Sequence, residues 1–372
     1  MAPGAPALQI VVGIDEAGYS PLLGPLVISA SIFGSDEPIT DWWQALGIPK
    51  AGRGRGGSGD PLDRTRPPKP LPLPIVDDSK KIYTPSEGLE ALETSVLAFL
   101  TVSRDRPQSL RDLLDAVGAC AEPDEYPWYR GADVSLPVAA DPQRVQACAD
   151  ALLDALRRAG AQFYGFHSSP ILEGELNRLV ARSGNKANLL LTGTLSLVER
   201  SMTATRSGVM TSDPSGAMTS DPSGVMTSDP SGVAANLVFA RSGSAVEFLI
   251  DKQGGRDFYS DALSQFFFGS RVTPGIEGND LSRYSVEYDG CRFDASFCVR
   301  GDASHLPIAL ASMLSKYIRE LFMTLFNRYW HSIDPALPRT SGYRTDGWRF
   351  VRALEASMQN TRVPKELLIR QK

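Results

Sequence analysis

The segment GIDEAGYSPLLGPLV, residues 13–27, spans the point where a buried strand ends and a tight turn begins. The β-branched run ALQIVVGID, residues 7–15, predicts a short strand that ends at Asp15. The glycines and prolines that follow predict a turn, and PLVISASIF, residues 25–33, predicts a second buried strand. We therefore expect this segment to start a β-sheet.

Two adjacent carboxylates, Asp15 and Glu16, close the first predicted strand. Neighbouring strand residues point to opposite faces, so one of the two acids is forced toward the core, and a bound cation would offset the cost of burying it. Further acids follow predicted strands at Asp251, which ends AVEFLID, and at Asp302, which ends FCVRGD. Taken singly, each acid is more simply explained as a solvated side chain. Together at one sheet edge, the four could hold two Mg²⁺ or Mn²⁺ ions.

The rest of the chain predicts an α/β domain with a central mixed sheet flanked by helices. Helical apolar spacing covers residues 86–101, 143–160, 255–268 and 306–330, and Asp289-Gly290 predicts a hairpin turn. Low-complexity sequence predicts disordered insertions at 51–74 and at 203–233, where an octapeptide repeats three times. We expect one catalytic domain over residues 1–345 and a basic helical tail over residues 346–372.

Composition sets broad limits on the function. The 372 residues are 42% hydrophobic, without the roughly 20-residue apolar run of a membrane helix or the basic start of a secretory signal. We expect a monomeric cytoplasmic protein without membrane contact, and four buried cysteine thiols. The net charge of −5 argues against nucleic-acid binding, but residues 339–372 carry eight Lys/Arg and three acids. That local surplus fits either a positive face or a solvated tail.

Four segments resemble ribonuclease HII, in the family's order. GIDEAGYSPLLGPLV resembles its G-x-D-E-A-G-R-G-P-x-x-G-P-V-V motif, and DSKK, residues 78–81, resembles its D-S-K-K segment. VRGDASHLPIALASMLSK, residues 299–316, resembles K-G-D-S…A-A-S-I-x-A-K, and SGYRT, residues 341–345, resembles K-G-Y-x-T. The resemblance implies a ribonuclease H-like fold. It also implies two-metal hydrolysis of the RNA strand in RNA/DNA hybrids, giving 5′-phosphate and 3′-hydroxyl ends.

Site residues follow from the same resemblance. It makes Asp15, Glu16, Asp251 and Asp302 the catalytic, metal-binding acids, with Asp257, Asp289 and Asp294 as alternatives to Asp251. It assigns substrate contacts to Gly18, Tyr19, Ser20, Ser79, Lys80, Lys81, Lys316 and Tyr343. It implies that Tyr343 packs against the ribose, although a lone tyrosine or lysine pair is more often ordinary packing or a solvated surface. Glu320 is expected to be structural.

The main departure is Gly18-Tyr19-Ser20, where the family has Gly-Arg-Gly. A serine adds a side chain where backbone must approach the nucleotide, so weak cutting at single embedded ribonucleotides is expected. Ribonuclease HIII also departs from Gly-Arg-Gly, but its fourth acid is typically Glu. Two other hypotheses remain: a nucleic-acid-binding protein of the same fold with impaired catalysis, and a small-molecule α/β enzyme. The second has no G-x-G-x-x-G fingerprint directly after the first predicted strand.

Overall fold

The computed structural model describes residues 8–51, 72–203, 245–253, 255–357 and 363–371. The two predicted insertions, 51–74 and 203–233, fall almost entirely outside these ranges. No helix in the described ranges combines the length and apolar character needed to cross a membrane.

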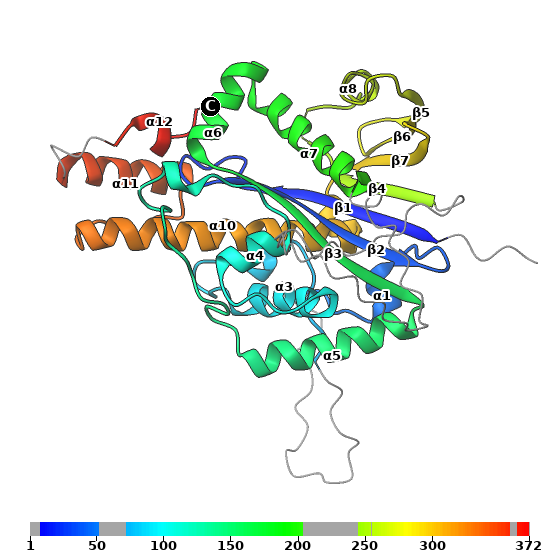
Figure 1. Ribbon diagram of the computed structural model, residues 1–372, viewed down its shortest axis with the longest axis horizontal. Coiled ribbons are helices and arrows are strands. Elements are labelled where there is room, and N and C mark those ends of the chain that lie inside the picture. Colours follow the sequence, from blue (N-terminus) through cyan, green and yellow to red (C-terminus); the bar gives the residue numbers. More distant parts are fainter. Residues whose placement is uncertain (1–7, 52–71, 204–244, 254, 358–362, 372) are drawn as a thin grey trace, which may run out of the picture.

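A seven-stranded mixed sheet forms the centre of the molecule, in the order β3-β2-β1-β4-β7-β6-β5 (Figure 1). Strands β1, β4 and β7 run parallel to one another, and every other neighbouring pair is antiparallel. The strands are β1 Gln9–Ala17, β2 Leu26–Ser35, β3 Ala161–Ile171, β4 Ala245–Asp251, β5 Arg271–Glu277, β6 Leu281–Tyr288 and β7 Cys291–Cys298. The predicted α/β class, with a central mixed sheet and flanking helices, is confirmed.

Helices cover both faces of the sheet (Figure 1). Those before β4 are α1 Trp42–Leu46, α2 Ser79–Ile82, α3 Glu90–Ser103, α4 Leu110–Ala116, the 3-10 helix η1 Pro123–Glu125, α5 Pro142–Arg158, α6 Glu173–Ser183 and α7 Lys186–Thr203. Those after it are α8 Ser260–Phe266, α9 Gly301–Ser304, α10 Leu306–Ile333, α11 Arg344–Ser357 and α12 Lys365–Leu368. The buried apolar residues of α3, α5 and α10 form a core on one face, and those of α6, α7 and α8 form a core on the other.

Strand alternation decides which face each side chain of β1 meets. Ile10, Val12 and Ile14 belong to the core beneath α7, so Gly13 and Asp15 lie on the opposite face, toward α10. The hydroxyl of Ser315 in α10 donates to the backbone oxygen of Asp15 over 3.2 Å. Because α10 is buried along most of its length, it packs firmly against the end of β1.

Gly13 is the point of closest approach between β1 and α10. A Cβ added there would lie 2.1 Å from the carbonyl carbon of Pro307, which is backbone and cannot rotate away. We predict that Gly13→Ala lowers the free energy of unfolding by about 3 kcal/mol, the upper end for overpacked sites. Denaturant unfolding checks this. The matched control is Gly278→Ala, whose added Cβ would have its nearest neighbour at 3.7 Å; a shift as large as that of Gly13→Ala would contradict the explanation.

Several predicted boundaries need correction. The hairpin at Asp289-Gly290 is present, and both residues have positive φ, 49° and 75°. The predicted helix at 255–268 is shorter and spans Ser260–Phe266. Asp302 does not end a strand: β7 stops at Cys298, and Asp302 lies in the short helix α9. The strand β3 was not predicted, because its Gly165, His167 and serines interrupt the apolar alternation.

The cysteines also differ from expectation. Cys148 and Cys298 are buried as predicted, whereas Cys120 and Cys291 are exposed. Within residues 346–372, helix α11 buries Phe350, Val351 and Leu354 against the α10 core, so it is part of the packed structure.

Candidate active site

The predicted acids meet at the carboxyl ends of β1 and β4. The parallel register pairs Ile14 with Ile250, which places the next residues, Asp15 and Asp251, at adjacent positions on neighbouring strands. Neighbouring strands lie about 4.8 Å apart, so the two carboxylates repel each other directly. Helix α9 brings Asp302 to the same place, because the backbone amide of Gly301 donates to Oδ1 of Asp251 over 2.7 Å.

Burial and mutual repulsion disfavour the charged forms of all four acids. Burial raises the pKa of Asp15 well above its ordinary value, and the charges of Glu16 and Asp251 raise it further. The pKa of Asp251 is raised to about 7, first by burial and then by Asp302 and Glu16, against a lowering effect of the Gly301 amide. Burial also raises the pKa of Glu16 and of Asp302. Such a cluster strongly attracts positive charge.

The structure separates Asp251 from the three alternatives that the sequence left open. Asp257 forms an ion pair with Lys252 at 2.8 Å. Asp294 lies opposite Glu247, four residues back along β4 from Asp251, and Asp289 occupies the hairpin turn beyond β6. Only Asp251 lies beside Asp15 among these four.

The four oxygen-donor side chains match the ligand preference of hard divalent cations. Across the described ranges, however, no three His, Cys, Asp or Glu side chains are arranged to hold one metal ion together. The donor chemistry therefore fits Mg²⁺ or Mn²⁺, while the carboxylates would have to rotate toward a common point to bind it. A carboxylate side chain can move between staggered rotamers at little cost in free energy.

The DSKK segment lies beside the acids on helix α2. Lys80 is exposed, and its positive charge lowers the pKa of Glu16, Asp251 and Asp302. Lys81 forms an ion pair with the buried Asp77 at 3.0 Å. Ser79 is buried, and its hydroxyl contacts that of Ser312 at 3.1 Å, which in turn hydrogen-bonds the Asp15 carboxylate. Ser79 thus supports Asp15 through Ser312, while the side chains of Lys80 and Lys81 are exposed.

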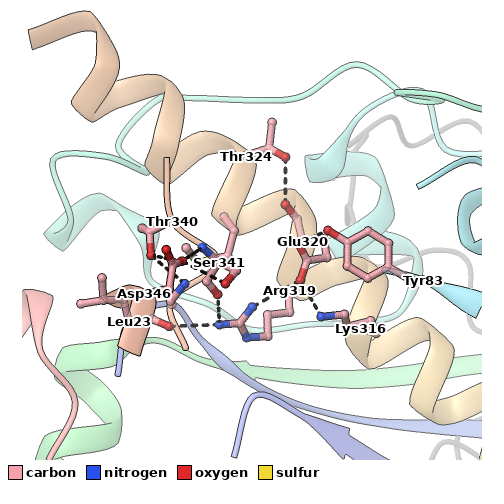
Figure 2. Close-up of polar contacts among 12 residues, drawn as sticks. Leu23, Tyr83, Lys316, Arg319, Glu320, Thr324, Thr340, Ser341 and Asp346 are labelled. Atoms are coloured by element: carbon pink, nitrogen blue, oxygen red, sulfur yellow. Dashed lines mark hydrogen bonds and ion pairs between the residues drawn. The ribbon is translucent and has the colours of Figure 1, made fainter. Parts of the chain in front are cut away.

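Helix α10 continues from Asp15 to a polar network around Arg319 (Figure 2). Arg319 is fully buried and donates to the backbone oxygens of Leu23, at 3.1 Å, and Ser341, at 2.9 Å. Glu320 accepts from Lys316 over 2.7 Å and from the hydroxyl of Tyr83 over 2.9 Å. Glu320 is therefore structural, and the predicted substrate residue Lys316 is buried and ion-paired.

Tyr343 lies at the open end of this network. Its side chain is 44% exposed, with the Lys316 ammonium 5.6 Å and the Arg319 guanidinium 5.4 Å from the ring centroid. Its neighbour Gly342 has φ +80°, and an added Cβ would lie 2.4 Å from the Leu23 carbonyl oxygen. Gly342 thus lets this segment approach the turn that follows β1, with the Tyr343 ring beside Lys316 and Arg319.

Close backbone contacts and side-chain hydrogen bonds hold the turn after Glu16 in place. Gly18 has φ +89°, and an added Cβ would lie 2.5 Å from the Pro25 carbonyl oxygen. Tyr19 is half-buried and Ser20 is exposed. Two further supports were not predicted from the sequence. Glu173 accepts from the Gly24 amide over 3.0 Å, and Arg370 donates to the carbonyl oxygens of Tyr19, at 3.2 Å, and Gly24, at 3.3 Å.

Glu173 gives a pH-dependent prediction. Burial raises its pKa from 4.5 to about 7, although Arg370 and several hydrogen bonds act in the opposite direction. The folded protein holds a proton that the unfolded chain has lost, so stability falls as the pH rises from 4.5 to 7. We predict that Glu173→Gln removes this pH-dependent loss in the free energy of unfolding, which is on the order of 3 kcal/mol. Urea unfolding of both proteins at several pH values checks it, and a difference that does not change with pH would contradict it.

Comparison with known proteins places the chain at a distance from characterised families. No protein-family model matches it, and no curated protein matches it. A chain in the structure of the PCNA:RNase HII complex from Archaeoglobus fulgidus is similar at 12% identity and a TM-score of 0.35, covering 98% of this chain and 95% of that one. Bst-RNase HIII in complex with Mn²⁺ is similar at 12% identity and a TM-score of 0.33, covering 97% of this chain and 66% of that one. Similarity this distant carries no information about activity.

Proposed function

We propose that this chain is a divalent-metal-dependent endoribonuclease that hydrolyses the RNA strand of RNA/DNA hybrids and leaves 5′-phosphate and 3′-hydroxyl ends. One observation carries the proposal. Asp15 and Asp251 lie side by side on β1 and β4, in electrostatic contact with Glu16 and Asp302, and the charged form of each is disfavoured. The four motifs that resemble ribonuclease HII support the choice of substrate.

Asp15, Glu16, Asp251 and Asp302 would hold two Mg²⁺ or Mn²⁺ ions. Such ions activate a water for in-line attack on phosphorus and stabilise the leaving oxygen. Ser312 and Ser315 of α10 fix Asp15 by hydrogen bonds to its carboxylate and its backbone oxygen. This support keeps Asp15 oriented while the charge around it changes during the reaction.

Lys80 and Lys81 would bind backbone phosphates, which fix the position of the substrate without reading its sequence. Lys80 is exposed next to the acids, and the Lys81 side chain is 55% exposed despite its ion pair with Asp77. Lys316 adds positive charge near Tyr343. These groups would draw the scissile phosphate toward an otherwise acidic site.

Tyr343 would pack against the ribose, where the 2′-hydroxyl distinguishes RNA from DNA. Its exposed ring beside Lys316 and Arg319 supports this role. The turn at Gly18-Tyr19-Ser20 would contact the flanking nucleotide, with Tyr19 half-buried and Ser20 exposed. We propose that single ribonucleotides embedded in DNA are cut poorly, because Ser20 occupies space that a closely approaching backbone would need.

The experiment is a cleavage assay with end-labelled substrates in Mg²⁺ or Mn²⁺. An RNA/DNA hybrid should be cut in the RNA strand, while duplex DNA stays intact and a single embedded ribonucleotide is cut slowly. Absence of hybrid cleavage in either metal would refute the proposed activity. Efficient incision at the single ribonucleotide would refute the part that concerns the Tyr19-Ser20 turn.

A second candidate is a nucleic-acid-binding protein of the same fold with impaired catalysis. It is favoured by the finding that no three side chains in the described ranges are arranged as ligands of one metal ion. Calorimetry separates the two candidates. Hybrid binding without measurable uptake of Mg²⁺ or Mn²⁺ would support the binding protein, whereas metal uptake that Asp251→Asn abolishes would support the nuclease.

A further inference from the structure

Two positively charged side chains contact Tyr19, and a third acts electrostatically on one of them. The ammonium of Lys186 lies 5.1 Å from the centroid of the Tyr19 ring, and the guanidinium of Arg370 donates to the Tyr19 carbonyl oxygen over 3.2 Å. Burial lowers the pKa of Lys186 to about 8, and the positive charges of Arg370 and Arg344 lower it further. Lys186 is more than 150 residues from both arginines in the sequence, so only the folded chain brings these like charges together.

Among the described residues, acidic side chains leave Lys186 and Arg344 unneutralised. Within the described residues, neither Lys186 nor Arg344 has an ion pair or a side-chain hydrogen bond. Asp346 is bonded to Thr340, Ser341 and Arg349. Glu173 interacts with Arg370 and is bonded to the turn through the amide of Gly24.

Burying an unpaired ammonium costs free energy, so a half-buried lysine beside two arginines indicates a place where an anion binds. The N-termini of two helices also favour an anion at this place. Lys186 is the first residue of the long helix α7, and Arg344 is the first residue of α11. Helix N-termini carry partial positive charge and present backbone amides, which favour phosphate groups. The cluster therefore combines full and partial positive charges at the rim of the turn that leaves Glu16.

We propose that Lys186 and Arg344, with Arg370 behind them, bind a backbone phosphate of the nucleic acid beyond the cleavage site. The inference rests on the proposed function for its substrate class, but it does not require hydrolysis. The turn from Gly18 to Pro25 begins two residues after Glu16, so a strand bound at the acids would continue toward this cluster. Lys80 would contact the strand at the acids, and Lys186 and Arg344 would contact it further along.

The test measures binding rather than cleavage. In an Asp15→Asn background, fluorescence anisotropy gives the affinity for a labelled RNA/DNA hybrid over a range of salt concentrations. Lys186→Gln should weaken binding about tenfold at low salt, and the slope of log K against log salt should fall by about one. Lys186→Gln combined with Arg344→Gln should reduce the slope by about two. Thermal unfolding should show that the variants remain folded.

The matched control is Arg158→Gln, which removes an exposed positive charge on α5, on the other side of the sheet. This variant should leave the affinity for the hybrid and the slope of log K against log salt unchanged. If Lys186→Gln behaves like Arg158→Gln, the inference is wrong, even where the wild type cleaves hybrids. If the wild type never cleaves but Lys186→Gln weakens binding selectively, the inference stands and the proposed hydrolysis fails. Tighter binding of inorganic phosphate than of the hybrid, lost in Lys186→Gln, would overturn the assignment to a strand phosphate.

Discussion

Asp15→Asn should lower the rate of RNA-strand cleavage on the order of 100- to 1000-fold, the effect expected when one electrostatic group of the transition state is removed. Asparagine keeps the size of the side chain and its contact with Ser312, but it loses the negative charge that a divalent ion needs. Single-turnover cleavage of an RNA/DNA hybrid in Mg²⁺ measures the change.

Stability separates this effect from unfolding. Burial raises the pKa of Asp15, so the charged carboxylate is unfavourable in the folded protein, and Asp15→Asn should not lower the thermal midpoint. Asp251→Asn should show the same loss of activity. Asp257→Asn, which removes an acid paired with Lys252, should retain activity within about twofold. Equal losses at Asp251 and Asp257, or full activity of Asp15→Asn, would contradict the proposed site.

Arg319→Met should lower the free energy of unfolding by about 3–5 kcal/mol, as for other buried ionic groups that lose a partner. The guanidinium is fully buried and joins α10 to the turn at Leu23 and to the segment at Ser341 (Figure 2). Methionine fills much of the volume but leaves both carbonyl oxygens without this donor. Urea denaturation monitored by tryptophan fluorescence measures the loss.

The control for Arg319→Met is Arg349→Met. Arg349 is 61% exposed and paired with Asp346, and an exposed pair contributes less than about 1 kcal/mol. If both variants are destabilised equally, the buried network is not what holds the turn. Cleavage assays add a second readout: because Arg319 holds the turn and borders Tyr343, its replacement should raise KM more than it lowers kcat.

Local sequence predicted two strands and one hairpin turn of the sheet correctly. The β-branched run before Asp15 forms β1, PLVISASIF lies within β2 and the turn before it, and Asp289-Gly290 forms the hairpin between β6 and β7. These features depend on neighbouring residues, because strand alternation and positive φ are local properties. Strand β3 was missed since its pairing with β2, which includes a register shift at Ile32 and Phe33, is a long-range property.

The sequence alone determined that Asp15 and Glu16 end a strand, and its motifs identified Asp251, Asp302 and the DSKK segment as candidates. It could not decide between Asp251 and Asp257, because only the parallel register of β1 and β4 places one of them beside Asp15. Nor could it show that Ser79 is buried against Ser312, or that Lys186 and Arg370 contact Tyr19 while Arg344 acts on Lys186. The sequence identifies which side chains could act at the site. Only the tertiary structure decides which of them are buried and which charges lie next to one another, because these properties arise when distant segments pack together.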